Sequence, residues 1–150
     1  MNMEIRKIQR DDLDQLGSIY CHLHEDESAP DSELTFDVWN DSEGSGIITY
    51  WGLFLQGVLV STCQMVIVPN ITRGCKPYCL IENVVTHPDF RNNGYGKAIL
   101  KHTLEHAWSQ GCYKAMLMTS RKSESVHNFY STAGFNGSEK HAYIAKPKNT

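Results

Sequence analysis

The sequence predicts a single α/β (α+β) domain in which helices flank a mixed sheet. With 150 residues, the chain is long enough for one domain, residues 1–150, with a substantial core. Its 41% hydrophobic and 21% charged residues are typical of a globular protein. Runs with strand-like composition alternate with runs of helical spacing, and a strand, a glycine turn and a helix follow one another at the centre.

The N-terminal half predicts two helices between a short strand and a long hairpin. Leu13, Leu16 and Tyr20 recur at helical spacing, and the stretch ESAPDSE ends that helix. Two β-rich runs follow, joined by Gln56-Gly57, which suits a hairpin turn. The predicted elements are a strand at residues 4–7, a helix capped by Asp11, a second helix with Leu34, Phe36, Val38 and Trp39, and strands at residues 47–54 and 58–68.

The C-terminal half predicts three strands and two helices. The mostly apolar run CLIENVVT is typical of a strand near the middle of a sheet. A glycine stands where each helix should end. The predicted elements are a loop at residues 69–77, a strand at 79–86, a helix with Ile99, Leu100, Thr103, Leu104, Ala107 and Trp108 inside and Gly111 at its end, a strand at 113–119, a helix between Ser123 and Gly134, and a strand at 141–146.

Charge is divided unevenly along the chain, although the net charge is only −3. Residues 11–72 contain eleven Asp and Glu and no Lys or Arg, whereas residues 73–150 contain eleven Lys and Arg and five acids. This division indicates two sites of opposite preference, and solvated acidic helix faces would give the same pattern. The basic half has no dense Lys/Arg run with interleaved aromatic residues, so nucleic acid is not an expected partner.

The cytosol is the expected compartment. The N-terminal stretch MNMEIRKIQR lacks the apolar core of a signal peptide, and no apolar run is long enough to span a bilayer, so no membrane partner is expected. Five cysteines without paired spacing predict buried, reduced thiols rather than a disulfide framework.

The stretch RNNGYG joins the central strand to the helix that follows. Backbone N–H groups at a helix N-terminus are free and attract an anion. Gly94 and Gly96 let the backbone approach a bulky anion, while Arg91 and Lys97 add positive charge. The turn fits neither the phosphate loop of nucleotide hydrolases, because Ala98 replaces the hydroxyl residue, nor the dinucleotide fingerprint, because its third glycine is absent.

The same region resembles the GNAT superfamily of acetyl-CoA-dependent N-acetyltransferases. The cofactor motif of that superfamily, [R/Q]-x-x-G-x-[G/A], is matched by Arg91, Gly94 and Gly96. The HPDFR lead-in and the NFYSTAGF segment at residues 128–135 are also similar to the family. The IENVVTHP strand resembles that of the glucosamine-6-phosphate N-acetyltransferase branch. The resemblance is specific over residues 78–135 and topological before them.

The resemblance implies a GNAT-like fold with a mostly antiparallel central sheet, acetyl-CoA as co-substrate, no metal, and a homodimer. It implies that the RNNGYG turn holds the pyrophosphate of coenzyme A and that the backbone of residues 84–86 pairs with the pantetheine arm like an extra strand. The cofactor-binding residues expected on this basis are Val84, Val85, Thr86, Arg91, Asn92, Asn93, Gly94, Tyr95, Gly96, Lys97 and Asn128.

Acetyl transfer from a thioester to an amine needs a proton acceptor, an oxyanion donor and an acid. Glu82 is the candidate base, because it is a carboxylate in an otherwise apolar strand; it could instead be a carboxylate that only hydrogen-bonds at the sheet surface. The resemblance makes Tyr130 the candidate acid, although its place on an apolar helix stripe also suits a core residue. Backbone N–H groups near Asn83 and Val84 are the expected oxyanion donors.

A second motif lies on the helix after the glycine turn. The HTLEH stretch that contains His102 and His106 matches the H-x-x-E-H pattern of inverted zinc peptidases. Both histidines are expected on the polar side of the helix, where a metal would lie in solvent with no obvious third ligand. Surface histidines are therefore the preferred interpretation.

The leading functional hypothesis is an N-acetyltransferase that moves the acetyl group of acetyl-CoA directly to the primary amine of a small molecule, a cationic amine or an amino sugar. The alternatives are a non-catalytic acyl-CoA-binding regulatory domain and an acetyltransferase for protein N-termini or lysines. In the family fold the first two helices border the acceptor cleft, so acids such as those at residues 25–27 favour a cationic amine over a phosphorylated sugar. Arg73 and Lys76 in the neighbouring loop favour the opposite.

Overall fold

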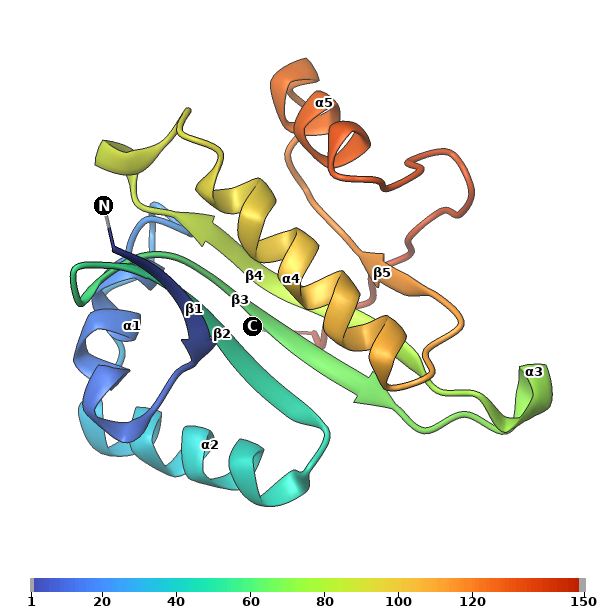
Figure 1. Ribbon diagram of the computed structural model, residues 1–150, viewed down its shortest axis with the longest axis horizontal. Coiled ribbons are helices and arrows are strands. Elements are labelled where there is room, and N and C mark those ends of the chain that lie inside the picture. Colours follow the sequence, from blue (N-terminus) through green and yellow to red (C-terminus); the bar gives the residue numbers. More distant parts are fainter. Residues whose placement is uncertain (1, 149–150) are drawn as a thin grey trace. The chain divides into compact units, whose positions relative to one another are not determined.

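The computed structural model describes residues 2–148 and contains a five-stranded sheet in the order β1-β2-β3-β4-β5 (Figure 1). The first four strands pair antiparallel, and the last pair is parallel. The mixed, mostly antiparallel sheet expected for the fold is therefore confirmed. The strands are β1 (Met3–Lys7), β2 (Ile48–Leu55), β3 (Val58–Val68), β4 (Tyr78–Thr86) and β5 (Ala115–Leu117).

The helices follow the order that the sequence predicts. Asp31 caps the second helix by accepting a hydrogen bond from the Leu34 N–H at 3.0 Å, and Gly46, with φ of 73°, ends it. The expected loop before β4 contains one short helical turn. The bounds are η1 (Arg10–Asp12), α1 (Leu13–Tyr20), α2 (Ser32–Ser45), α3 (Thr72–Cys75), η2 (Pro88–Phe90), α4 (Tyr95–Ser109) and α5 (Glu124–Thr132).

The chain divides into two compact units, one up to Leu117 and one from Met118 onward, and each is described by itself. The first unit holds the whole sheet and α1 to α4. The second unit contains α5, in which Tyr130 packs against Phe129 and Phe135 at ring-centroid distances of 5.0 and 6.2 Å.

Within the first unit, α2 and α4 cover opposite faces of the sheet. Tyr50 and Trp51 are neighbours on β2, so their side chains point to opposite faces. The Tyr50 hydroxyl lies 3.1 Å from the Ser42 hydroxyl of α2, whereas the Trp51 ring lies 4.5 Å from the His102 ring of α4. On the α2 face, α1 contributes to a buried apolar cluster made of Ile8, Leu16, Ile19, Tyr50, Phe54, Leu59 and Val85.

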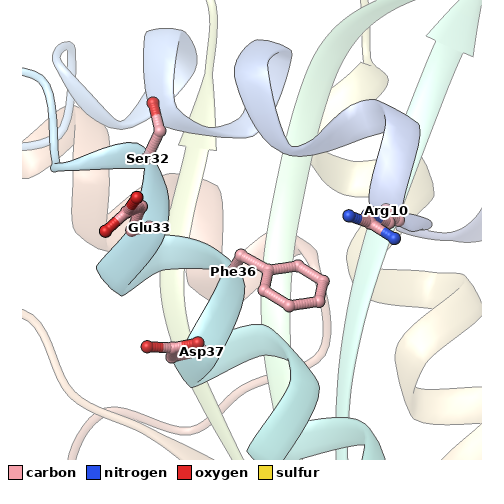
Figure 2. A pocket seen from close by; sticks show the side chains of 5 residues that line it. All are labelled: Arg10, Ser32, Glu33, Phe36 and Asp37. Carbon is pink, nitrogen blue, oxygen red and sulfur yellow. The ribbon is translucent and has the colours of Figure 1, made fainter.

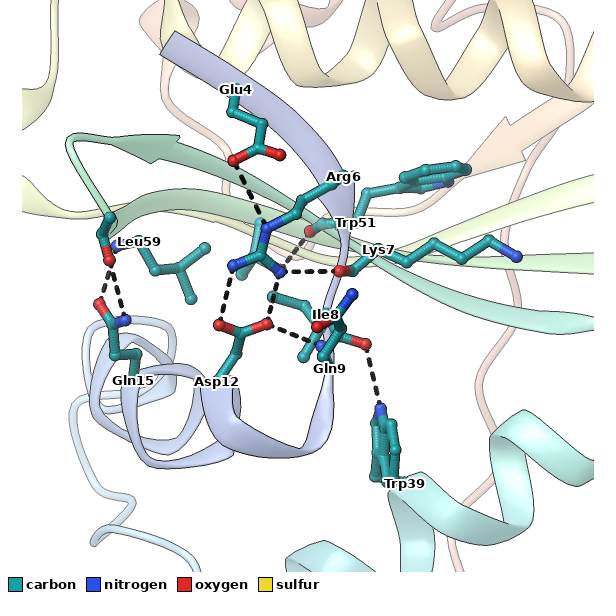
Figure 3. A network of polar contacts seen from close by, with 12 residues as sticks. Glu4, Arg6, Lys7, Ile8, Gln9, Asp12, Gln15, Trp39, Trp51 and Leu59 are labelled. Carbon is teal, nitrogen blue, oxygen red and sulfur yellow. Dashed lines mark hydrogen bonds and ion pairs between the residues drawn. The ribbon is translucent and has the colours of Figure 1, made fainter. Parts of the chain in front are cut away.

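A paired polar network joins β1 to the start of α1 (Figure 3). Arg6 donates two hydrogen bonds to the Asp12 carboxylate, at 2.6 and 3.0 Å, and the Gln9 N–H donates a third at 2.7 Å. The hydrogen bonds from Arg6 are the largest cause of the lowered pKa of Asp12. The expectation that Asp11 caps the helix is wrong, because Asp11 lies within η1 and Asp12 is the N-cap residue of α1, with no side-chain cap hydrogen bond.

Three other predictions are corrected by the structure. The strand predicted at residues 113–119 is shortened to β5, and residues 141–146 form no strand. Tyr143 and Ile144 in that segment are 92% and 77% exposed, so β-forming side chains alone do not make a strand without a neighbour to pair with. All five cysteines are free, but Cys75 is exposed rather than buried.

Among the described residues, no helix is both long and apolar enough to cross a membrane.

Candidate functional site

A β-bulge interrupts the pairing of β4 with β3. Val85 pairs with Thr62 and Glu82 pairs with Gln64, so two residues of β4, Asn83 and Val84, face one residue of β3. Asn83 adopts a left-handed backbone with φ of 54°, which asparagine tolerates better than most residues. The peptide groups of both bulged residues therefore leave the regular β3–β4 ladder.

The second half of β4 has an open edge on the side of β5. The parallel ladder with β5 ends where Ile81 pairs with Leu117, and no described strand pairs with residues 82–86 on that edge. An edge of this kind offers backbone N–H and C=O groups to an extended ligand, which can add to the sheet like a further strand. These residues include Val84, Val85 and Thr86, which were expected to pair with the pantetheine arm.

The RNNGYG turn follows β4 and presents an uncapped helix N-terminus. Gly94 is the N-cap residue of α4 with φ of 80°, and a Cβ placed there would meet nothing within 4 Å. No side chain caps the helix, so the N–H groups of its first turn, at Tyr95, Gly96 and Lys97, are available to an anion. The need for glycine at residue 94 is thus conformational.

Side chains of the turn brace it without reaching the helix N–H groups. The Asn93 amide donates to the carbonyls of Phe90 and Arg91, at 3.1 and 2.9 Å. Arg91 donates from Nε to the Thr86 carbonyl at 3.2 Å, which ties the turn to the end of β4. The open strand edge and the uncapped helix are therefore held together by direct contact.

Glu82 lies on the face of the sheet that α1 and α2 cover. It pairs across β3 with Gln64, which pairs with Tyr50 of β2, and directly paired residues point to one face. Glu82 is half buried, and its carboxylate has no hydrogen bond or ion pair to the described residues. Its carboxylate is therefore available to a ligand on that face.

Asn128 and Tyr130 lie on α5 in the second unit. Asn128 is exposed and Tyr130 is half buried among aromatic rings of its own unit. Glu82 and the residues of β4 and the turn that are expected to bind the cofactor all lie in the first unit. The roles of Asn128 and Tyr130 stay predictions.

His102 and His106 are not the solvent-exposed residues that the helical pattern suggested. Both are half buried, with rings 4.5 and 5.1 Å from the Trp51 ring in edge-to-face contacts. Burial, followed by the charges of Lys7 and His102, lowers the pKa of His106. The two histidines pack because Trp51 projects from β2 toward α4, a contact that no helical spacing can reveal. Within the described chain, no group of three or more His, Cys, Asp or Glu could hold a metal ion.

An open cavity of about 340 Å³ lies beside the start of α2 (Figure 2). Its acids, Glu33 and Asp37, share it with Arg10, whose guanidinium lies 4.7 Å from the Phe36 ring centroid. None of its lining residues belongs to β4 or the RNNGYG turn. The cavity is therefore distinct from the site around the bulge, and its acidic charge is partly balanced by Arg10.

Comparison with known proteins shows the family of the chain. A model described as the Acetyltransferase (GNAT) family matches residues 13–135. The chain belongs to the GNAT family. This GNAT protein is 32% identical over 143 residues, 93% of each chain, to a glucosamine 6-phosphate N-acetyltransferase of Trypanosoma brucei brucei. It is accordingly an acetyl-CoA-dependent acyltransferase that acts on an amine.

Two solved structures share the fold of this GNAT acetyltransferase. A protein of Agrobacterium tumefaciens str. C58 assigned as an acetyltransferase superposes with a TM-score of 0.90 at 32% identity, covering 95% of this chain and 99% of that one. Glucosamine-6-phosphate N-acetyltransferase from Arabidopsis thaliana superposes with a TM-score of 0.85, covering 99% of this chain and 100% of that one. At 22% identity, the second likeness concerns the fold alone.

Sequence reasoning missed one polar contact at the site of this acetyltransferase. Gln64 of β3 accepts a hydrogen bond from the Asn83 side chain at 3.1 Å. The only sequence signal is a polar residue within a β-rich run, which is equally typical of a strand surface. Its partner became visible only with the register of β3 and β4.

Proposed function

We propose that this acetyltransferase transfers the acetyl group of acetyl-CoA directly to the primary amine of an amino sugar, with glucosamine 6-phosphate as the first acceptor to test. The observation that carries the proposal is the β4 bulge, which brings a half-buried, unpaired Glu82 next to an open strand edge. The 32% identity to a glucosamine 6-phosphate N-acetyltransferase over 93% of both chains supports the acceptor class.

The residues of the site meet the demands of this reaction. The turn before α4 binds the coenzyme A pyrophosphate, and the open edge of β4 binds the pantetheine arm. Glu82 accepts a proton from the ammonium group, directly or through water, so that the neutral amine attacks the thioester carbonyl. A C–N bond forms and backbone N–H groups at the bulge stabilise the oxyanion. The C–S bond then breaks, Tyr130 protonates the departing thiolate, and the second proton of the attacking nitrogen returns through water to the Tyr130 phenolate, which leaves a neutral amide.

The phosphate of the sugar would not be held by the loop before β4 of the same chain. Lys76 precedes Glu82 by six residues of extended chain, a separation of roughly 20 Å at ~3.3 Å per residue. A hexosamine phosphate alone is shorter than this backbone separation, so both side chains would have to extend fully toward the ligand. We therefore do not assign phosphate recognition to Arg73 and Lys76 of the same chain.

A cationic amine such as a polyamine is the second candidate, favoured by the exposed acids after α1. Glu25, Asp26 and Glu27 are exposed, and no ion pair to a described residue neutralises them. Other acids of the same segment are occupied, since Asp12 pairs with Arg6 and Asp31 caps α2. The negative field at the proposed acceptor side is therefore weaker than the charge count suggests, and we rank the amino sugar first.

The test is thiol release from acetyl-CoA with glucosamine 6-phosphate, glucosamine and spermidine at two salt concentrations, with products identified by mass. The Glu82→Gln variant serves as the control. We expect the highest kcat/KM with an amino sugar. If kcat/KM were highest for spermidine and this preference weakened as salt rises, the cationic amine would replace the amino sugar as the proposed acceptor. Turnover of none of the three would refute a small-amine function.

The free thiols also lead us to place the protein in the cytosol, which localisation of a tagged chain would test.

A further inference from the structure

The left-handed residue in β4 is unusual because it is not a glycine. Asn83 has φ of 54° in the middle of a strand whose neighbours are extended. Asparagine tolerates this conformation better than most residues, and within a strand the contacts of its surroundings stabilise it there. The contacts of Asn83 therefore control the shape of the bulge.

Gln64 supplies the side-chain contact that holds Asn83. The Asn83 Nδ2 donates to the Gln64 Oε1 at 3.1 Å, and both side chains are half buried. Neither side chain makes another hydrogen bond to the described residues. Gln64 is also the backbone partner of Glu82, the residue just before the bulge. One residue of β3 thus contacts both the candidate base and the residue that shapes the bulge.

The backbone conformation of Asn83 sets the direction of the peptide groups that follow it. Asn83 and Val84 have no partner residues in the β3 ladder, and they lie on the open edge of residues 82–86. A donor contributes to catalysis only if it is aimed at the oxygen where charge develops. A small rotation at Asn83 would turn the backbone N–H groups of the bulge away from that oxygen, without removing any group that binds the cofactor.

We propose that Gln64 is a positioning residue for acetyl transfer, which fixes the left-handed conformation of Asn83 through their side-chain hydrogen bond and so aims the backbone donors of the bulge. This inference rests on the proposed function. Since oxyanion charge grows only in the transition state, loss of the bond lowers kcat and leaves the KM for acetyl-CoA and for the acceptor nearly unchanged.

The test replaces Gln64 by methionine, which is similar in size and lacks the amide. We expect Gln64→Met to lower kcat by about 10- to 100-fold with little change in either KM. The matched control is Gln15→Met, because the Gln15 amide also joins structural elements, by bonds to Gly57 and Leu59, but lies away from the bulge. It should lower the melting temperature and leave kcat unchanged.

A double-mutant cycle separates positioning from a merely structural role. Glycine adopts the left-handed conformation without a side-chain contact, so Gln64→Met should have no further effect on kcat in an Asn83→Gly background. Equal losses in both backgrounds, or no loss in either, would overturn the inference.

A readout that does not depend on turnover keeps the inference separate from the proposed function. The ¹³C chemical shifts of Asn83 report its left-handed backbone, and Gln64→Met should abolish that signature in the free protein. If the signature survives in Gln64→Met, the inference fails even where the wild type acetylates an amino sugar. If the wild type releases no thiol while the signature is lost, the proposed function fails and Gln64 remains only the structural holder of the bulge.

Discussion

The β1–α1 junction and the β4 bulge belong to one sheet, yet their polar groups are paired to very different extents. At the junction, Arg6, Gln9 and Asp12 satisfy one another within 3.0 Å (Figure 3). At the bulge, the Glu82 carboxylate has no hydrogen-bond or ion-pair partner among the described residues, the edge of β4 is open, and α4 begins without a side-chain cap. Both regions contain carboxylates and backbone N–H groups, but only at the β1–α1 junction do these groups bond to one another.

The difference separates groups that stabilise the fold from groups that are kept available to ligands. A paired carboxylate lowers the free energy of the folded state, whereas an unpaired one costs stability and remains free to bind or to accept a proton. Substitutions at the junction should therefore change unfolding and spare turnover, and substitutions at the bulge and the turn should do the reverse.

The largest effect is expected for Glu82→Gln. Glutamine keeps the shape of the side chain but cannot accept the proton, so kcat should fall by about 10²- to 10⁴-fold. Acetyl-CoA affinity and the melting temperature should stay near the wild-type values, because the Glu82 carboxylate makes no hydrogen bond or ion pair to the described residues. Steady-state kinetics over a range of pH, with calorimetric titration of acetyl-CoA, measures both. Normal turnover at every pH would assign the base to water or another group.

At the junction, Asp12→Asn should act on stability instead. The substitution removes charge-assisted hydrogen bonds to Arg6 and should lower the free energy of unfolding by about 2–3 kcal/mol at neutral pH. Urea unfolding measures this loss, and kcat of the remaining folded enzyme should be unchanged. A drop in kcat at equal folded fraction would contradict the separation of the two regions.

The same variant has a defined pH dependence. The folded-state pKa of Asp12 is lowered chiefly by hydrogen bonds from Arg6, so its stabilisation is present above the unfolded pKa, about 3.9, and is lost as pH falls through the lower folded value. The stability difference between wild type and Asp12→Asn should therefore shrink below about pH 4. A difference that stays constant down to that range would exclude the Arg6 pair as its cause.

A smaller effect is expected for Gly96→Ala in the first turn of α4. An added methyl group should hinder the approach of the pyrophosphate and raise the dissociation constant of coenzyme A by about tenfold, roughly 1.4 kcal/mol. Gly44→Ala is the matched control, because Gly44 is also helical and a Cβ there meets nothing within 4 Å. Calorimetry should show unchanged affinity for that control, and equal affinity in both variants would remove the turn from the cofactor site.

The smallest effect is expected for Tyr20→Phe on α1. The Tyr20 hydroxyl is buried without a hydrogen-bond partner in the described part of the chain, and burial is the main cause of its raised pKa. Removing a buried, unpaired hydroxyl should leave the melting temperature unchanged or raise it by a few degrees. Tyr50→Phe, which loses the contact with Ser42, should lower it. Destabilisation of Tyr20→Phe would show that a water molecule or ligand pairs with that hydroxyl.

Local residue preferences explain how much of the fold could be predicted from the sequence. Gly94 directly precedes the helical run that follows the central strand, and glycine is the residue that the left-handed N-cap requires. Gln56 and Gly57 likewise gave the hairpin, where both have positive φ. The strand predicted at residues 141–146 is absent from the structure. Composition predicts the capacity to form a strand but not the presence of a partner strand.

Long-range register explains why the candidate site was only partly predictable. The IENVVT run indicates an uninterrupted strand, and nothing local shows that Asn83 and Val84 face a single residue of β3. The contact of Gln64 with Asn83 joins residues nineteen apart in the chain. His102 and His106 pack on Trp51, which lies still further away in the sequence. Residues within one turn were predictable, whereas pairs across the sheet were not.

Amide hydrogen exchange with and without acetyl-CoA tests the central claim most directly, because it observes the unpaired backbone groups themselves. The account predicts that acetyl-CoA slows exchange at Val84 to Thr86 and at Tyr95 to Lys97, and leaves the Gln9 amide, already bonded to Asp12, unchanged. Protection confined to other segments, or no protection of β4 and α4 at saturating acetyl-CoA, would contradict it.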